Sequence, residues 1–89
     1  FNMPTNQQAR EYYNKLKIHQ SNLIETLKTL QNPTQSSSPS IESVQQFEKF
    51  IEENPSGRFV PYNSLFFIFT HNLLTSIQRT IRDIKLLAN

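Results

Sequence analysis

The two histidines are the first residues to consider for chemistry, because imidazole transfers protons near neutral pH and binds metal ions. Neither His19 nor His71 has a second histidine or a carboxylate three or four residues away. That spacing would place two such groups on one face of a helix. His19 falls on an apolar stripe, which is typical of a histidine at the edge of a core, whereas His71 falls on a polar side. We expect neither residue to be catalytic or to hold a metal.

Carboxylates gather in the middle of the chain, where Glu48, Glu52 and Glu53 resemble part of a site for a hard metal ion. Such sites usually add Asp, Asn or backbone ligands from a loop bent at glycine, and no such loop is present here. A solvated acidic helix face is the simpler interpretation. With one glycine and no Gly-x-Ser-x-Gly elbow, the sequence also lacks a phosphate-binding loop and an activated serine. The sequence predicts a protein without catalytic residues, cofactor or metal.

Basic residues form two groups that could meet phosphate or the acidic side chains of a partner. They are Arg10, Lys17 and Lys28 on one flank of the first expected helix, and Arg79, Arg82 and Lys85 on the back of the last. Nine basic and seven acidic residues leave a net charge of only +2. Sites for single-stranded nucleic acids stack the bases on aromatic residues placed among the basic ones, and no aromatic residue is interleaved in this way here. We interpret them mainly as solubilising residues and keep nucleic-acid binding as a minor alternative.

The first element that must position these groups is a helix predicted for residues 5–32. Thr5 and Gln8 have the spacing of a capping box, and Asn32 precedes a proline that ends the helix. Apolar residues seven apart favour long, coiled-coil-like packing against another helix. The full stripe contains Ala9, Tyr12, Tyr13, Leu16, His19, Gln20, Leu23, Leu27 and Leu30.

Two further helices are predicted, for residues 41–54 and 62–88, after a flexible Ser- and Pro-rich loop at 33–40. The loop contains minimal phosphorylation patterns at Thr34 and Ser38, and Ser38 or Ser40 is expected to cap the second helix. Gly57 is expected in a turn with a positive φ. The apolar stripes are Ile41, Val44, Phe47, Phe50 and Ile51, followed by Phe66, Thr70, Leu73, Leu74, Ile77, Ile81, Ile84 and Ala88.

These elements predict an all-α fold, a small three-helix bundle with long, short and long helices in an up-down-up order. Residues 1–89 form a single domain, and because the chain starts at Phe1 we expect it to be a piece of a longer protein. The longest apolar run has five residues, against roughly 20 in a membrane span. A membrane anchor is therefore not expected.

That five-residue run, residues 65–69, is the best indication of function, because it is apolar on every side of the helix. One interpretation is that Phe59 and Val60 fold back over Phe67 and Phe69. The other is a groove that accepts an amphipathic helix or short apolar peptide from another protein. Its predicted residues are Phe59, Tyr62, Phe66, Phe67 and Phe69, with Ile68 on the outer side of the same turn.

We expect a non-enzymatic protein interaction module of an intracellular protein, in the nucleus or the cytoplasm. The Asn-, Gln- and Ser-rich composition is typical of regulatory chains, so transcription or chromatin regulation is the expected setting. The main alternative is a structural helical subunit that forms an obligate homo-oligomer or complex. A nucleic-acid-binding domain is the third possibility.

Overall fold

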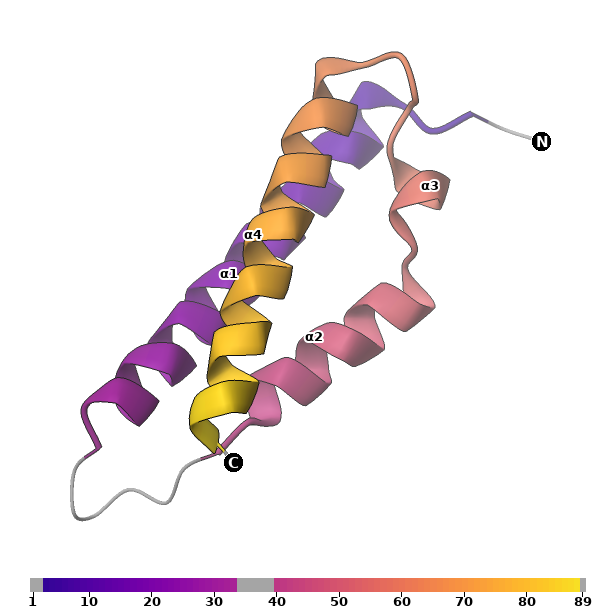
Figure 1. Ribbon diagram of the computed structural model, residues 1–89. Helices are drawn as coiled ribbons and strands as arrows, with labels where there is room; N and C mark the ends of the chain where they lie inside the picture. The colour runs from indigo at the N-terminus through magenta and orange to yellow at the C-terminus, as the bar shows by residue number, and fades with distance from the viewer. Residues whose placement is uncertain (1–2, 34–39, 89) are drawn as a thin grey trace.

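The computed structural model describes residues 3–33 and 40–88 (Figure 1). They form four helices: α1 Asn6–Gln31, α2 Glu42–Glu53, α3 Ser56–Phe59 and α4 Leu65–Ala88. The two long helices α1 and α4 lie side by side and run in the same direction (Figure 1). The helix α2, which lies between them in the sequence, runs in the opposite direction. The expected all-α bundle with up-down-up helices is confirmed. Its shape is elongated, with extents of 51 × 20 × 18 Å.

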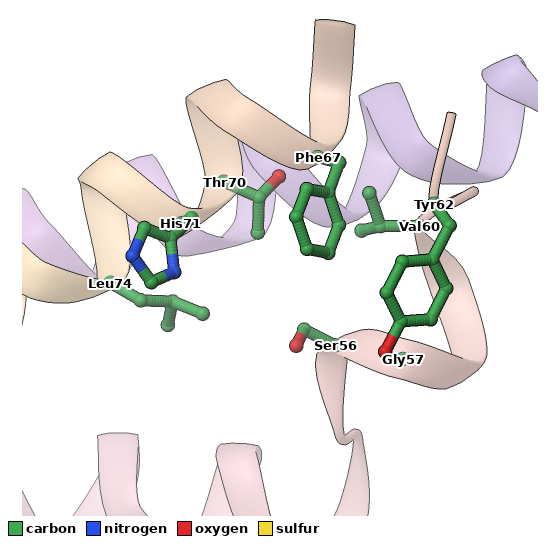
Figure 2. Close-up of a pocket in the computed structure, with 8 residues that line it drawn as sticks. All are labelled: Ser56, Gly57, Val60, Tyr62, Phe67, Thr70, His71 and Leu74. Atoms are coloured by element: carbon green, nitrogen blue, oxygen red, sulfur yellow. The ribbon is translucent and has the colours of Figure 1, made fainter. Parts of the chain in front are cut away.

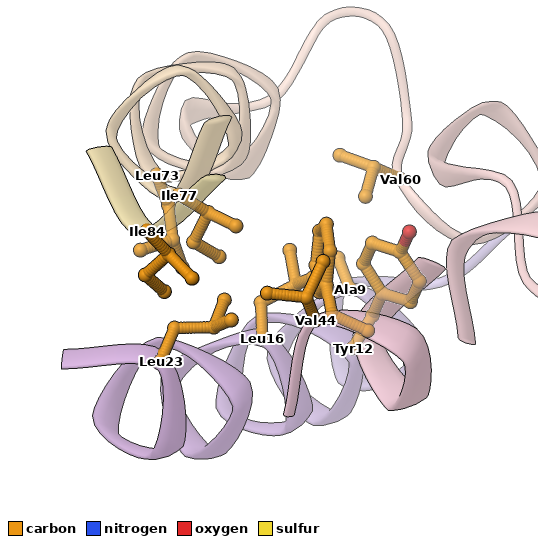
Figure 3. Packing of buried hydrophobic residues seen from close by; sticks show 10 residues of the cluster. Ala9, Tyr12, Leu16, Leu23, Val44, Val60, Leu73, Ile77 and Ile84 are labelled. Carbon is orange, nitrogen blue, oxygen red and sulfur yellow. The ribbon is translucent and has the colours of Figure 1, made fainter. Parts of the chain in front are cut away.

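The core lies along the contact between α1 and α4. Leu16 and Leu23 of α1 face Ile77 and Ile84 of α4, and all four side chains are completely buried (Figure 3). The seven-residue spacing on α1 produces this contact, since it repeats one face about every two turns. The apolar stripe predicted for the last helix included Ala88, but Ala88 is exposed and does not belong to the core.

The short helix α2 packs mainly against α1. The rings of Phe47 and Phe50 lie 5.6 and 4.8 Å from the His19 ring. Nearer the start of α2, the hydroxyls of Thr26 and Ser43 are 2.6 Å apart and share a hydrogen bond. Toward α4, α2 forms an exposed ion pair between Glu48 and Lys85, and such pairs contribute at most about 1 kcal/mol.

The side-chain cap predicted for the start of α1 is present, but the one predicted for α2 is not. The Thr5 hydroxyl accepts a hydrogen bond from the Gln8 N–H, and the Gln8 side chain accepts one from the Thr5 N–H, so the capping box is present. The N-cap residue of α2 is Ile41, which makes no side-chain capping hydrogen bond, so the predicted cap at Ser40 is wrong. Ser40 lies one residue earlier, and its hydroxyl accepts a 3.3 Å hydrogen bond from the N–H of Glu42, the first residue of α2. The other candidate cap, Ser38, the phosphorylation pattern at Thr34 and most of the predicted loop lie outside the described residues.

The predicted start of the last helix at residue 62 is wrong, because α4 begins at Leu65. Val60 precedes a proline and is extended, with φ −122° and ψ 120°, so the chain is not helical immediately before Pro61. Residues 61–64 form a turn instead, in which the Ser64 hydroxyl donates to the Pro61 carbonyl at 2.9 Å. Before this turn lies α3, which no prediction anticipated. Gly57 belongs to α3 and has a negative φ, so the predicted positive φ is also wrong.

The position of His19 makes the stability of the bundle dependent on pH. Desolvation by burial lowers its pKa below the ordinary value of about 6.5, so the folded state prefers the neutral ring. Below about pH 6.5 the unfolded chain binds a proton that the folded chain resists, and the free energy of unfolding decreases. We expect urea unfolding to show this decrease between about pH 7 and about pH 5, and a smaller one in His19→Gln. An equal decrease in both proteins would contradict the assignment to His19.

Candidate functional site

A hollow of about 290 Å³ lies between α3 and α4, on the side of α4 that faces α2. The residues that α4 contributes to this hollow are spaced by three or four positions, so they belong to one face of the helix. The remaining wall comes from α3 and the extended segment that follows. The lining residues, drawn in Figure 2, are Ser56, Gly57, Val60, Tyr62, Phe67, Thr70, His71 and Leu74.

Two aromatic rings form one edge of the hollow. Tyr62 stacks on Phe67 with ring centroids 5.1 Å apart and an interplanar angle of 25°. Although stacked, Tyr62 remains 77% exposed and Phe67 39% exposed. Aromatic side chains of this kind offer a large apolar contact area at a low cost in conformational entropy, and they are enriched in protein interfaces.

The floor of the hollow is formed by Val60 and Thr70, which are both buried. The Thr70 hydroxyl has no hydrogen-bond partner among the described residues. In Figure 2 its methyl group points into the space between α4 and α3, and the hydroxyl points toward Phe67. The surface that the hollow presents at this position is therefore apolar.

Because the buried hydroxyl is desolvated without compensation, we expect Thr70→Val to stabilise the protein by about 1 kcal/mol. Valine has nearly the same shape, and it is also β-branched, so packing and helix propensity change little. Thr75→Val is the matched control, since the Thr75 hydroxyl already donates to the His71 carbonyl at 3.0 Å. Thermal unfolding of both variants would test this. A loss of stability in Thr70→Val would show that its hydroxyl is satisfied in solution.

Polar groups lie at the mouth of the hollow. Ser56 is half-buried, His71 is exposed, and no hydrogen bond joins them in the structure of the described residues. Within the same residues, no three His, Asp or Glu side chains are grouped as metal ligands. What the site offers is thus a recess with a mixed lining, apolar at Val60, Phe67 and Leu74 and polar at Ser56 and His71. Its apolar part is suited to holding an apolar side chain by contact.

The structure separates the residues predicted to share one groove. Tyr62 and Phe67 line the hollow, but Phe59 turns toward α1 and stacks on Tyr12, with ring centroids 5.2 Å apart. Phe66 is half-buried against the core. Phe69 is 50% exposed and Ile68 is 55% exposed, and neither lines the hollow.

The alternative in which Phe59 and Val60 cover the aromatic residues describes only part of the structure. Val60 lies beside Phe67 in the hollow, whereas Phe59 contacts Tyr12. Of the five residues 65–69, four stay exposed and only Phe66 is half-buried. This segment therefore carries more apolar surface than the described chain covers.

The sequence prediction missed Thr70, His71 and Leu74 as residues of this site. Their spacing from Phe67 contained the signal, because positions 67, 70, 71 and 74 share one side of a helix. Val60 and Ser56 could not be found in this way, since they reach the site only through α3 and the turn after it.

Comparisons with models of protein families, with curated proteins and with solved structures found no match to this chain. The class that its fold and site define is a small helical bundle with a partly apolar recess. None of the described helices has both the length and the apolar character of a membrane span.

Proposed function

We propose that this protein is a non-enzymatic interaction module, in which the hollow between α3 and α4 receives an apolar side chain from a helix or short peptide of a partner protein. The observation that carries the proposal is the exposed Tyr62–Phe67 stack beside a partly apolar recess. A single anchor residue in a desolvated recess typically contributes much of the binding energy of such a complex.

The rival function, a structural subunit of an obligate assembly, has less support. The outward side of α4 carries Ile68 and Leu86, which are 55% and 70% exposed. They are 18 residues apart, or about 27 Å along the helix axis. Polar residues lie between them on that side, including Thr75 and Arg79. Permanent interfaces usually have a continuous apolar centre, which this side does not provide.

The test begins with panning a library of random peptides, displayed on phage, against the full chain. We expect the selected peptides to bind Phe67→Ala at least about tenfold more weakly, because the substitution removes one wall of the recess. The free energy of unfolding of this variant should decrease by only about 1 kcal/mol, since Phe67 is already 39% exposed. Ile68→Ala is the matched control, and it should bind the same peptides unchanged.

Undiminished binding of every selected peptide to Phe67→Ala would contradict docking in the hollow. A loss of stability of about 3 kcal/mol or more would instead identify Phe67 as a core residue.

A further inference from the structure

The pair formed by α1 and α4 has a second exposed side, opposite α2 and α3. All ring and hydroxyl contacts from α1 to these two short helices come from Tyr12, His19 and Thr26. With about 100° per residue, Gln20 lies on the other flank of α1. There its side chain donates to the Ser76 hydroxyl of α4 at 3.3 Å. In Figure 1, α2 and α3 lie on one side of the long pair, and no described helix covers the other.

Apolar side chains line this second side. Ile24 shares the Gln20 flank of α1 and is 38% exposed, while Phe69 and Leu87 share the Ser76 flank of α4 and are 50% and 49% exposed. Tyr13, half-buried, lies two turns before Gln20 on the same flank. We name this surface the outer seam; it consists of Tyr13, Gln20, Ile24, Phe69, Ser76 and Leu87.

One edge of the outer seam is positively charged. Arg10, Lys17 and Lys28 follow the α1 flank at spacings of seven and eleven residues, which keep them in one row. The acidic residues of α1 point elsewhere, since Glu11 and Glu25 line hollows shared with α2. Four more acidic residues belong to α2. Asp83 on α4 is then the acidic residue left on the outer side. Among the described residues, no carboxylate forms an ion pair with Arg10, Lys17 or Lys28.

We propose that the outer seam docks an amphipathic helix of another protein whose apolar face covers Ile24, Phe69 and Leu87 and whose glutamate or aspartate residues lie over the basic row of α1. A further helix packed along two parallel neighbours completes a four-helix arrangement, in which its apolar stripe fills the groove between them. The charges on the partner follow from complementarity with Arg10, Lys17 and Lys28. This surface is separate from the hollow between α3 and α4.

Two other occupants fit the surface less well. A second copy of this chain would offer Asp83 as the acidic residue of its outer side, so most of the basic row of α1 would have no opposite charge across the interface. A nucleic acid would match the basic row but would leave Phe69 and Leu87 against a polar backbone. An acidic-edged helix satisfies both the apolar centre and the basic edge.

Two synthetic peptides of about 20 residues test the proposal by fluorescence anisotropy with the full chain. Both carry the same leucine stripe, and one has glutamates beside it where the other has lysines. We expect the glutamate peptide to bind at least about tenfold more tightly. Phe69→Ala and the double variant Lys17→Glu/Lys28→Glu should each weaken it by about tenfold. Amide NMR shifts should fall on the outer seam.

Control variants separate this surface from the rest of the molecule. The double variant Lys49→Glu/Arg58→Glu makes the same change in net charge on α2 and α3 and should leave binding of the glutamate peptide within about twofold. Phe67→Ala should also leave binding of the glutamate peptide unchanged. The proposal for the outer seam can therefore be contradicted while the hollow still binds its peptides, and the reverse is equally possible.

Equal affinity of the two peptides, or NMR shifts confined to the hollow, would overturn the proposal. So would a dimer in sedimentation that Phe69→Lys disrupts, because a second copy would then be the occupant. Tight, strongly salt-dependent binding of a short DNA or RNA duplex, competing with the glutamate peptide, would assign the surface to nucleic acid instead.

Discussion

Replacing Tyr12 with alanine is expected to destabilise the protein by about 3 to 5 kcal/mol, the range for large aromatic residues removed from a core. Tyr12 is 3% exposed and joins three helices. Its ring stacks on Phe50 of α2 at 5.6 Å and on Phe59 of α3 at 5.2 Å. Its hydroxyl donates a 2.7 Å hydrogen bond to the carbonyl of Asn54, which caps the end of α2. One truncation therefore removes contacts that hold both α2 and α3 to α1.

Tyr12→Phe separates the hydroxyl from the ring. It keeps the stacking and should cost only about 1 kcal/mol, the net value of one hydrogen bond. Burial raises the pKa of Tyr12 to about 12, from an ordinary value of about 10. As the pH rises between these values, the unfolded chain ionises first and the folded state loses stability. This alkaline loss should be smaller in Tyr12→Phe. Urea unfolding of the three proteins measures both effects, and equal costs for the alanine and phenylalanine variants would contradict the role of the ring.

Leu16→Ala is expected to cost about 2 to 5 kcal/mol, because Leu16 is completely buried where α1 packs against α4. A domain of this length has a total stability on the order of 4 to 13 kcal/mol, so the variant could lose half of it or more. Ile18→Ala is the matched control on the same helix, since Ile18 is 63% exposed. It should change the stability by less than about 0.5 kcal/mol.

Circular dichroism during thermal unfolding would compare the two variants. A small effect of Leu16→Ala would mean that α1 and α4 do not pack through the residues spaced by seven. A large effect of Ile18→Ala would mean that the outward side of α1 is covered in solution.

The long helices were predictable from the sequence because their signals are local and repeated. Leu16 and Leu23 are seven residues apart, and Thr5 with Gln8 marks the beginning of α1. The same logic failed around Gly57 and Tyr62. There the structure depends on single effects, namely the restriction that Pro61 imposes on Val60 and the hydrogen bond from Ser64 to the Pro61 carbonyl. A four-residue helix has too few positions to show a period.

The candidate site was predictable only in part. The apolar excess of residues 65–69 indicated exposed surface, and four of the five residues are indeed exposed. The division of that surface was not visible, because neighbouring positions on α4 such as Phe67 and Phe69 differ in direction by about 200°. Phe67 consequently joins the hollow beside α3, and Phe69 joins the outer seam. The start of α4 thus contributes to both sides of the long pair.

Gly57 lines the hollow, yet its backbone has a negative φ, and a Cβ atom added there would meet no atom within 4 Å. Neither strain nor crowding demands glycine at this position. The fold would accept a larger residue on the rim, and its bulk would set how wide the entrance is. A substitution at this one position would therefore change the size of the side chain that the hollow admits, without altering the helices that form the core.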